Sequence, residues 1–210
     1  RQLLQWLGGI GIIVLAVAVL PMLGIGGVQL YRAESTGPAK DSKLTPRITS
    51  TAKALFSIYL GLTVACAAAY YLAGMSAFDA ISHAFSTIAI GGFSTHDASM
   101  GYFQSDVILV IACLFMLISA VNFGLHFVAF SKRNPGIYSF DSETKFFAGV
   151  LLISAIITCI TLIAMGTLSA DKAIIHGLFQ TVSIATTTGY ASDHFAAWPS
   201  FLPIFLIMLS

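Results

Sequence analysis

The sequence has little charge and no paired cysteines. Only 9% of its 210 residues are charged and 57% are hydrophobic, whereas about 25% of an average soluble domain is charged. A formal net charge of +1 excludes general electrostatic attraction to nucleic acid. Cys66, Cys113 and Cys159 each lie in a long apolar run, without the paired spacing of a disulfide or metal site. We therefore expect a chain built for a lipid bilayer, with its cysteines buried.

Four long apolar runs and the start of a fifth divide the sequence. An α-helix needs roughly 20 apolar residues to cross the roughly 30 Å hydrocarbon layer. Runs close to or above that length cover residues 3–30, 55–73, 107–130 and 146–165, and another starts at Phe201. Pro21 is expected to kink the first run, and residues 122–124 (Asn-Phe-Gly) to bend the third. These runs predict an all-α membrane protein.

Two shorter apolar segments lie between the long runs and resemble each other. Residues 82–94 (SHAFSTIAIGGFS) and 179–192 (FQTVSIATTTGYAS) both end in small residues followed by glycine and an aromatic residue. A run of roughly 10–14 apolar residues is too short to span a bilayer and is typical of a re-entrant segment. Non-helical backbone at membrane depth occurs where it lines a water-filled path or is buried in protein. The duplication therefore predicts two pore loops, each after a short pore helix.

Basic residues indicate the orientation and the units. Eight of the ten Lys and Arg lie in two connections, which the positive-inside rule places in the cytoplasm: Arg32, Lys40, Lys43, Arg47, Lys53, Lys132, Arg133 and Lys145. The re-entrant segments then face outward, and successive units form parallel repeats around a central pore.

We expect an internal piece of a longer protein in three parts. Residues 1–47 hold the last span of one unit, 48–143 a complete second unit, and 144–210 a truncated third unit.

The two loops have the composition of a cation filter. Backbone carbonyls in an extended segment can replace the hydration shell of an ion, and glycine permits the positive φ that such a segment needs. The preceding helix directs its negative dipole end at the same place. Neither 89–93 nor 186–190 contains an acidic residue. Carbonyl oxygens and threonine hydroxyls as ligands favour a weakly hydrated monovalent cation over calcium or magnesium.

Two registers relate the loops. Matching Gly92 with Gly189 also matches Ser86 with Ser183, whereas matching His83 with His176 shifts the alignment by four residues, about one helical turn. We expect the glycine register to hold, because a filter tolerates less slippage than the start of a helix.

An enzyme and a coupled carrier are the alternatives. Asp79, His83 and Ser86 have the helical spacing of a hydrolytic set. The corresponding stretch of the third unit has Lys172, His176 and Phe179 instead, which favours helix capping and packing over catalysis. A sodium- or proton-coupled carrier is expected to bury charged residues in mid-span, and the complete runs contain none. We therefore predict a channel-like protein rather than an enzyme.

The motifs at residues 5–11 (QWLGGIG), 20–27 (LPMLGIGG), 83–98 (HAFSTIAIGGFSTHDA) and 180–192 (QTVSIATTTGYAS) resemble the Trk/Ktr/HKT superfamily of potassium transporters. The resemblance implies a four-unit pore for potassium uptake in the bacterial cytoplasmic membrane, without a cofactor. It also implies a homodimer and a cytosolic nucleotide-binding regulatory subunit, TrkA in the Trk branch. Family filters bind ions through backbone carbonyls, here those of Ile90, Gly91, Gly92, Thr187, Thr188 and Gly189. Glycine at both 92 and 189 implies a preference for potassium over sodium.

Overall fold

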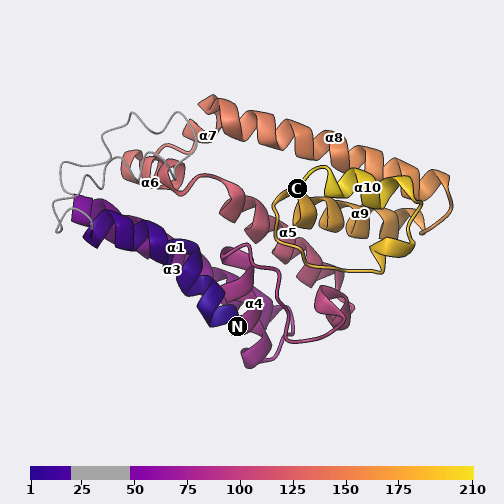
Figure 1. The fold of residues 1–210 in the computed structure, drawn as a ribbon, viewed down its shortest axis with the longest axis horizontal. Coiled ribbons are helices and arrows are strands. Elements are labelled where there is room, and N and C mark those ends of the chain that lie inside the picture. Colours follow the sequence, from indigo (N-terminus) through magenta and orange to yellow (C-terminus); the bar gives the residue numbers. More distant parts are fainter. Residues whose placement is uncertain (20–47) are drawn as a thin grey trace.

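The computed structural model describes residues 1–19 and 48–210, and the regular elements of these ranges are all helical (Figure 1). They are α1 (Gln2–Val19), α3 (Ile48–Leu72), α4 (Ala77–Ile88), η3 (Ser99–Phe103), α5 (Asp106–Ala120), α6 (Phe123–Lys132), α7 (Ile137–Phe140), α8 (Ser142–Ala164), α9 (Ala170–Ala185), η4 (Phe195–Ala197) and α10 (Phe201–Ile207). The all-α fold is therefore confirmed. The predicted kink at Pro21 and the basic residues from Arg32 to Arg47 lie outside the described residues.

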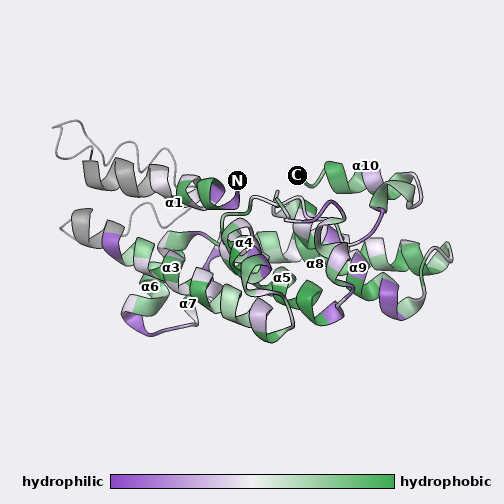
Figure 2. Ribbon diagram, turned by 90° about the horizontal axis from the view of Figure 1, so that it is seen from below, coloured by the Kyte–Doolittle hydropathy of each residue, from purple (hydrophilic) through white to green (hydrophobic). Residues whose placement is uncertain are grey.

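Within residues 1–19 and 48–210, two helices are long and apolar enough to cross a membrane by length and composition. Lys53–Leu72 in α3 has 20 residues with a mean hydropathy of 1.7, and Ser142–Ala164 has 23 residues with a mean hydropathy of 2.6. They match the runs at 55–73 and 146–165. Figure 2 shows hydrophobic residues along α5 and α8, with hydrophilic residues gathered in the connections and near helix ends. Several large hydrophobic side chains of α8 are exposed, among them Leu152, Ile153 and Ile160, which suits contact with lipid.

The third run forms two helices with a sharp bend between them rather than a single straight helix. α5 and α6 meet at 89°, and α5 alone has 15 residues, about 22 Å of helix. Asn122 starts the second helix by accepting a hydrogen bond from the Gly124 amide on its side chain. His126 satisfies the end of the first by bonding to the Ile118 carbonyl at 2.9 Å, and its other nitrogen lies 2.8 Å from the Tyr138 hydroxyl. The predicted bend at 122–124 is confirmed, and it divides the run into two helices.

The two pore helices differ by one turn. α4 has 12 residues and α9 has 16. Their N-caps, Ser76 and Ser169, are 93 residues apart, whereas their C-caps, Ala89 and Thr186, are 97 apart. The helix starts therefore follow the histidine register and the helix ends follow the glycine register. The glycine register is confirmed where the loops begin.

The larger of the two cores among the described residues joins the predicted second and third units. α4 packs against α3 and α1, α9 packs against α8, and α5 lies between the two groups (Figure 1). Fully buried members of this core come from α3, α5 and α9, namely Tyr70, Met116 and Phe179. A second, smaller core lies within the third part alone, around Leu162 and Leu202. The division at 1–47, 48–143 and 144–210 stays a prediction, because the larger core crosses from the second part into the third. The three cysteines are free; Cys66 and Cys113 are buried as expected, and Cys159 is half-buried.

Candidate functional site

The two loops after the pore helices share an unusual backbone. φ is +53° at Ile90 and +68° at Gly92, and it is +61° at Thr187 and +85° at Gly189. In the glycine register these are equivalent positions, and the residue between each pair, Gly91 or Thr188, does not have a positive φ. Positive φ in a β-branched residue such as Ile90 or Thr187 is rare and costs about 1–3 kcal/mol. Strain repeated at equivalent positions marks a candidate functional site.

The loops also lie against each other, although 97 residues separate them in the sequence. A Cβ added at Gly92 would overlap the Thr188 carbonyl oxygen and would lie 3.1 Å from the carbonyl carbon of Gly189. Ile90, Gly91 and Gly92 are half-buried, Thr188 is buried, and Thr187 and Gly189 are exposed. The six predicted filter residues are therefore brought together. Their role as ion ligands stays a prediction.

We call residues 89–93 the second loop and residues 186–190 the third loop, after the predicted units to which they belong. Hydrogen bonds from the pore helix α4 and from α1 hold the second loop. The Gly91 amide donates to the Ser86 carbonyl at 2.8 Å, and the Phe93 amide donates to the Ser86 hydroxyl at 2.8 Å. Gln5 Nε2 in α1 donates to the Gly91 carbonyl at 3.0 Å. Sequence reasoning missed the role of Gln5, since only the fold places α1 beside this loop.

The third loop is held by a similar set from its own helix. The Ser183 hydroxyl donates to the Tyr190 carbonyl at 2.8 Å, and Gln180 Nε2 donates to the same oxygen at 3.2 Å. The Gly189 amide donates to the Ser183 carbonyl at 3.1 Å. Ser86 and Ser183 thus contact the residue after the glycine in both loops. The matching serines in the two copies were the sequence signal for this role.

Tyr190 connects the third loop to the second pore helix. Its ring is fully buried, and its hydroxyl donates to the His83 carbonyl in α4 at 3.2 Å. The same hydroxyl lies 3.3 Å from Thr87 Oγ1, which lies 2.9 Å from the Tyr70 hydroxyl. The equivalent residue in the second loop, Phe93, is 49% exposed. The two glycine-aromatic pairs therefore have equivalent positions but different surroundings.

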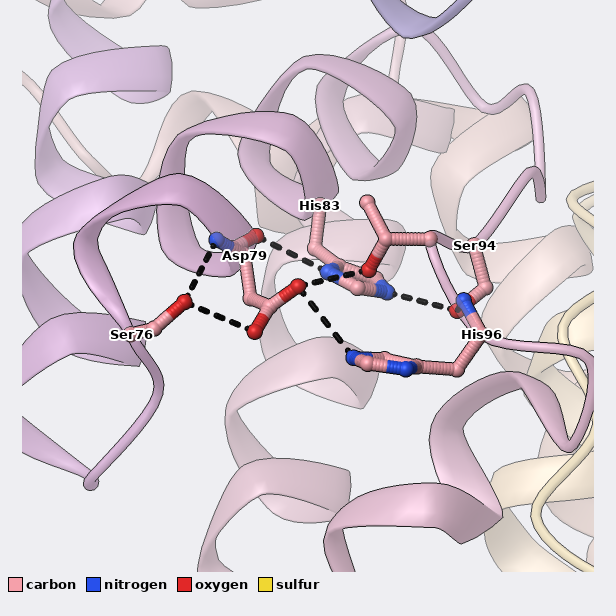
Figure 3. Close-up of polar contacts among 6 residues, drawn as sticks. Ser76, Asp79, His83, Ser94 and His96 are labelled. Carbon is pink, nitrogen blue, oxygen red and sulfur yellow. Dashed lines mark hydrogen bonds and ion pairs between the residues drawn. The ribbon is translucent and has the colours of Figure 1, made fainter.

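The residues of the candidate hydrolytic set do not act together. His83 Nδ1 bonds to the backbone carbonyl of Asp79 at 2.8 Å, not to its carboxylate. His83 Nε2 shares a 2.8 Å hydrogen bond with Ser94, while Ser86 faces Phe93. Figure 3 shows the bonds of His83 to the Asp79 carbonyl and to Ser94. A triad needs the carboxylate on Nδ1 and the nucleophile on Nε2, so the geometry favours capping and packing.

The Asp79 carboxylate ties the outer end of the loop to the start of α4. It accepts hydrogen bonds from Thr95 at 2.6 Å and Ser76 at 2.7 Å, and His96 Nε2 lies 3.2 Å away (Figure 3). Burial raises the pKa of Asp79, but the bonds from Thr95 and Ser76 and the charge of His96 outweigh it, so the pKa lies below its ordinary 3.8. Asp79 is thus held as a carboxylate that anchors the loop.

Side-chain metal ligands do not gather in the parts of the chain that the structure describes, where no three His, Cys, Asp or Glu residues come close enough to hold a metal ion. The oxygens that the two loops present are main-chain carbonyls and threonine hydroxyls. Thr186 and Thr188 share a hydrogen bond of 2.7 Å between their hydroxyls.

Comparisons with known proteins agree on one family. The family model TrkH, described as cation transport protein, matches residues 1–210. The Trk system potassium uptake protein TrkH of Vibrio parahaemolyticus is 57% identical over 213 residues, which cover 100% of this chain and 44% of that protein. Its Escherichia coli counterpart is 55% identical over 99% of this chain and 43% of its own length. TrkG of Escherichia coli is 42% identical over 100% of this chain and 43% of its own length.

A solved structure has the same fold. The crystal structure of the potassium transporter TrkH from Vibrio parahaemolyticus matches with a TM-score of 0.83 and 52% identity, over 100% of this chain and 42% of that chain. The sequence thus spans less than half the length of the relatives that it matches.

Proposed function

Because the chain belongs to the TrkH family of cation transport proteins, we propose that it forms part of a pore for potassium uptake across the bacterial cytoplasmic membrane. The observation that carries the proposal is the pair of strained loops, in contact with each other and alike in φ at equivalent positions. Relatives named for potassium uptake support the choice of ion.

The proposed ligands are the carbonyls of Ile90, Gly91, Gly92, Thr187, Thr188 and Gly189. An ion that leaves water loses hydration free energy on the order of tens of kcal/mol, which other oxygens must replace. Alternation of left- and right-handed backbone turns successive amides to one side and successive carbonyls to the other. The φ signs along 90–92 and 187–189 alternate in this way. The carbonyls of each loop can therefore converge on one cation.

The pore helices supply a further attraction for a cation. α4 ends at Ile88 and α9 ends at Ala185, just before the two loops. The C-terminal end of a helix carries a partial negative charge of roughly half an electron. Two such ends that point at adjacent loops stabilise a cation there without any acidic side chain.

The assembly is also a proposal, since the chain covers 44% of the Vibrio parahaemolyticus relative. We expect further units to complete a four-unit pore, and two copies of the whole protein to form a homodimer. A TrkA-like cytosolic nucleotide-binding subunit is expected to gate it. The exposed basic residues Lys53, Lys132, Arg133 and Lys145 lie near the ends of α3, α6 and α8 on the predicted cytoplasmic side, where that subunit would bind.

Ion flux through the full-length protein in liposomes tests the function. Rubidium uptake should follow the rubidium gradient alone, with no sodium or proton gradient. Gly189→Ser should lower the preference for potassium over sodium, because a side chain disfavours φ of +85°. Gly74→Ser, in the turn before α4 at φ of +103°, is the matched control and should keep the preference. Uptake that strictly requires sodium or protons would favour the coupled carrier, and an unchanged ratio in Gly189→Ser would contradict the filter.

A further inference from the structure

A glutamine from the preceding span reaches the second loop. Gln5 Nε2 donates to the Gly91 carbonyl at 3.0 Å, and Gln5 Oε1 accepts from the Ser86 hydroxyl at 3.3 Å. The Ser86 hydroxyl accepts in turn from the Phe93 amide at 2.8 Å. We call these four residues the Gln5 network. It holds the Gly91 carbonyl, which precedes Gly92, and the Phe93 amide, which follows Gly92.

The network determines how its own members are oriented. A hydroxyl has one proton to donate and two lone pairs, so Ser86 can accept from Phe93 and still donate to Gln5. With Oε1 turned to Ser86, the amide nitrogen of Gln5 faces the Gly91 carbonyl. The reversed amide would set two acceptors, Oε1 and the Gly91 oxygen, against each other. Each bond in the network therefore favours the same arrangement.

Gln5 also occupies the space that a side chain at residue 91 would need. A Cβ added at Gly91 would lie between 2.5 and 2.6 Å from the side-chain amide atoms of Gln5. The equivalent residue in the third loop is Thr188, which does carry a side chain. There the glutamine is Gln180 in the pore helix itself, and it bonds to the Tyr190 carbonyl at 3.2 Å. In the second loop a glutamine from the neighbouring span, Gln5, contacts a filter loop with glycine at position 91. In the third loop the glutamine belongs to the pore helix, and the equivalent position is Thr188.

The backbone that carries Gln5 is fixed to α3. Trp6 Nε1 donates to Thr63 Oγ1 at 2.9 Å, and the Tyr59 hydroxyl donates to the Trp6 carbonyl at 3.1 Å. Trp6 is 8% exposed and stacks on Tyr59. These bonds place the amide of Gln5 relative to the loop independently of the network. α1 therefore provides a rigid support for the filter of the next unit.

We propose that Gln5 is a positioning residue that sets the ion discrimination of the second filter from the preceding span. The proposal rests on the proposed function, because it assigns Gln5 to the filter that the function requires. Gln5 binds no ion in this proposal; it holds the Gly91 carbonyl at its place in the filter. A movement of α1 would accordingly change the second filter directly.

The test compares potassium and sodium permeability of the full-length protein in liposomes. Gln5→Leu keeps the bulk of the side chain and removes both bonds. We expect rubidium uptake to persist while the potassium to sodium permeability ratio falls about threefold to tenfold, the effect of one net hydrogen bond. Gln2→Leu, one turn earlier in α1 and outside the network, is the control and should keep the wild-type ratio. Gln5→Asn, one methylene too short, should resemble Gln5→Leu and tests the same bonds if the leucine variant does not reach the membrane.

A double substitution separates positioning from general damage. Gly91→Ala should lower the ratio because it displaces the Gln5 amide, and adding Gln5→Ala should cause less further loss than Gln5→Ala causes alone. Groups in contact show such coupling, whereas independent sites are additive. A wild-type ratio in Gln5→Leu and Gln5→Asn, or additive effects of Gly91→Ala and Gln5→Ala, would overturn the proposal. A wild-type protein that does not prefer potassium to sodium would instead overturn the proposed function.

Discussion

Gly92 and Gly189 occupy equivalent positions, yet they should tolerate an added methyl group very differently. Both have φ in the left-handed region, +68° and +85°. An L-residue costs about 1–2 kcal/mol there, which lowers an equilibrium population by roughly 5- to 30-fold. This backbone strain is common to both alanine substitutions.

The surroundings of the two Cβ positions differ. A Cβ at Gly92 would overlap the Thr188 carbonyl oxygen, so Gly92→Ala must push the two loops apart. Within the described residues, nothing lies within 4 Å of a Cβ at Gly189. Gly189→Ala therefore adds backbone strain alone. Gly92→Ala adds the same backbone strain and also displaces the Thr188 carbonyl. We expect Gly92→Ala to abolish selective potassium uptake and Gly189→Ala to retain weakened, measurable uptake.

The assay is rubidium uptake with potassium to sodium permeability ratios, normalised to the amount of protein in the membrane. Gly166→Ala is the matched control, because Gly166 has φ of +64° and open space around its Cβ but lies in the turn between α8 and α9. It should lose a comparable amount of stability and keep the wild-type ratio. Equal damage from Gly92→Ala and Gly189→Ala, or an unchanged ratio in Gly92→Ala, would refute the contact between the loops as we describe it.

Three further predictions address the supports of the filter. Tyr190→Phe removes the hydroxyl that joins the third loop to α4; it should cost about 1 kcal/mol and lower both Tm and the permeability ratio, and no change in either would contradict the link. Thr188→Val keeps the carbonyl and should retain uptake. Abolished uptake would show that ion binding depends on the Thr188 hydroxyl rather than on the carbonyl alone. The pKa of Asp79 is lowered on folding, so its stabilisation is present above its ordinary 3.8 and is lost as pH falls through the folded value. Tm should therefore fall on acidification below about pH 4, and less so in Asp79→Asn; equal acid sensitivity would exclude this anchor.

The helices were predictable from local features of the sequence. Apolar runs of the right length mark α3 and α8, and Asn122 and Gly124 mark the break between α5 and α6. The size of that break was not predictable. It depends on His126, which reaches back to the Ile118 carbonyl and across to Tyr138, and such contacts form only in the folded chain.

The position of the candidate site was predictable from the sequence, but the hydrogen bonds that hold its loops were not. Glycine and small residues indicated where the loops lie, yet Ile90 and Thr187 are β-branched, and their own preference opposes the φ that they adopt. Local capping bonds at the helix ends favour it, from the Ile90 amide to the Thr87 carbonyl and from the Thr187 amide to the Ile184 carbonyl. Contacts with residues distant in sequence add to these local bonds. Gln5 lies 86 residues from Gly91, and Tyr190 lies 107 residues from His83. Sequence periodicity carries no information about such pairs.

The one-turn difference between the pore helices shows which part of the helix specifies the filter. Asp79 bonds to Thr95 in the second unit, and His176 bonds to Ser192 at the equivalent positions of the third. Both units therefore have a hydrogen bond from the start of the pore helix to the outer end of the loop, but the residue types that form it differ. At the inner end the serine and glycine are the same in both units, and each serine hydroxyl bonds at 2.8 Å to the residue after the glycine. Ser86 accepts from the Phe93 amide, and Ser183 donates to the Tyr190 carbonyl. Filter geometry is thus set from the C-terminal end of the pore helix, which leaves its N-terminal end free to differ in length.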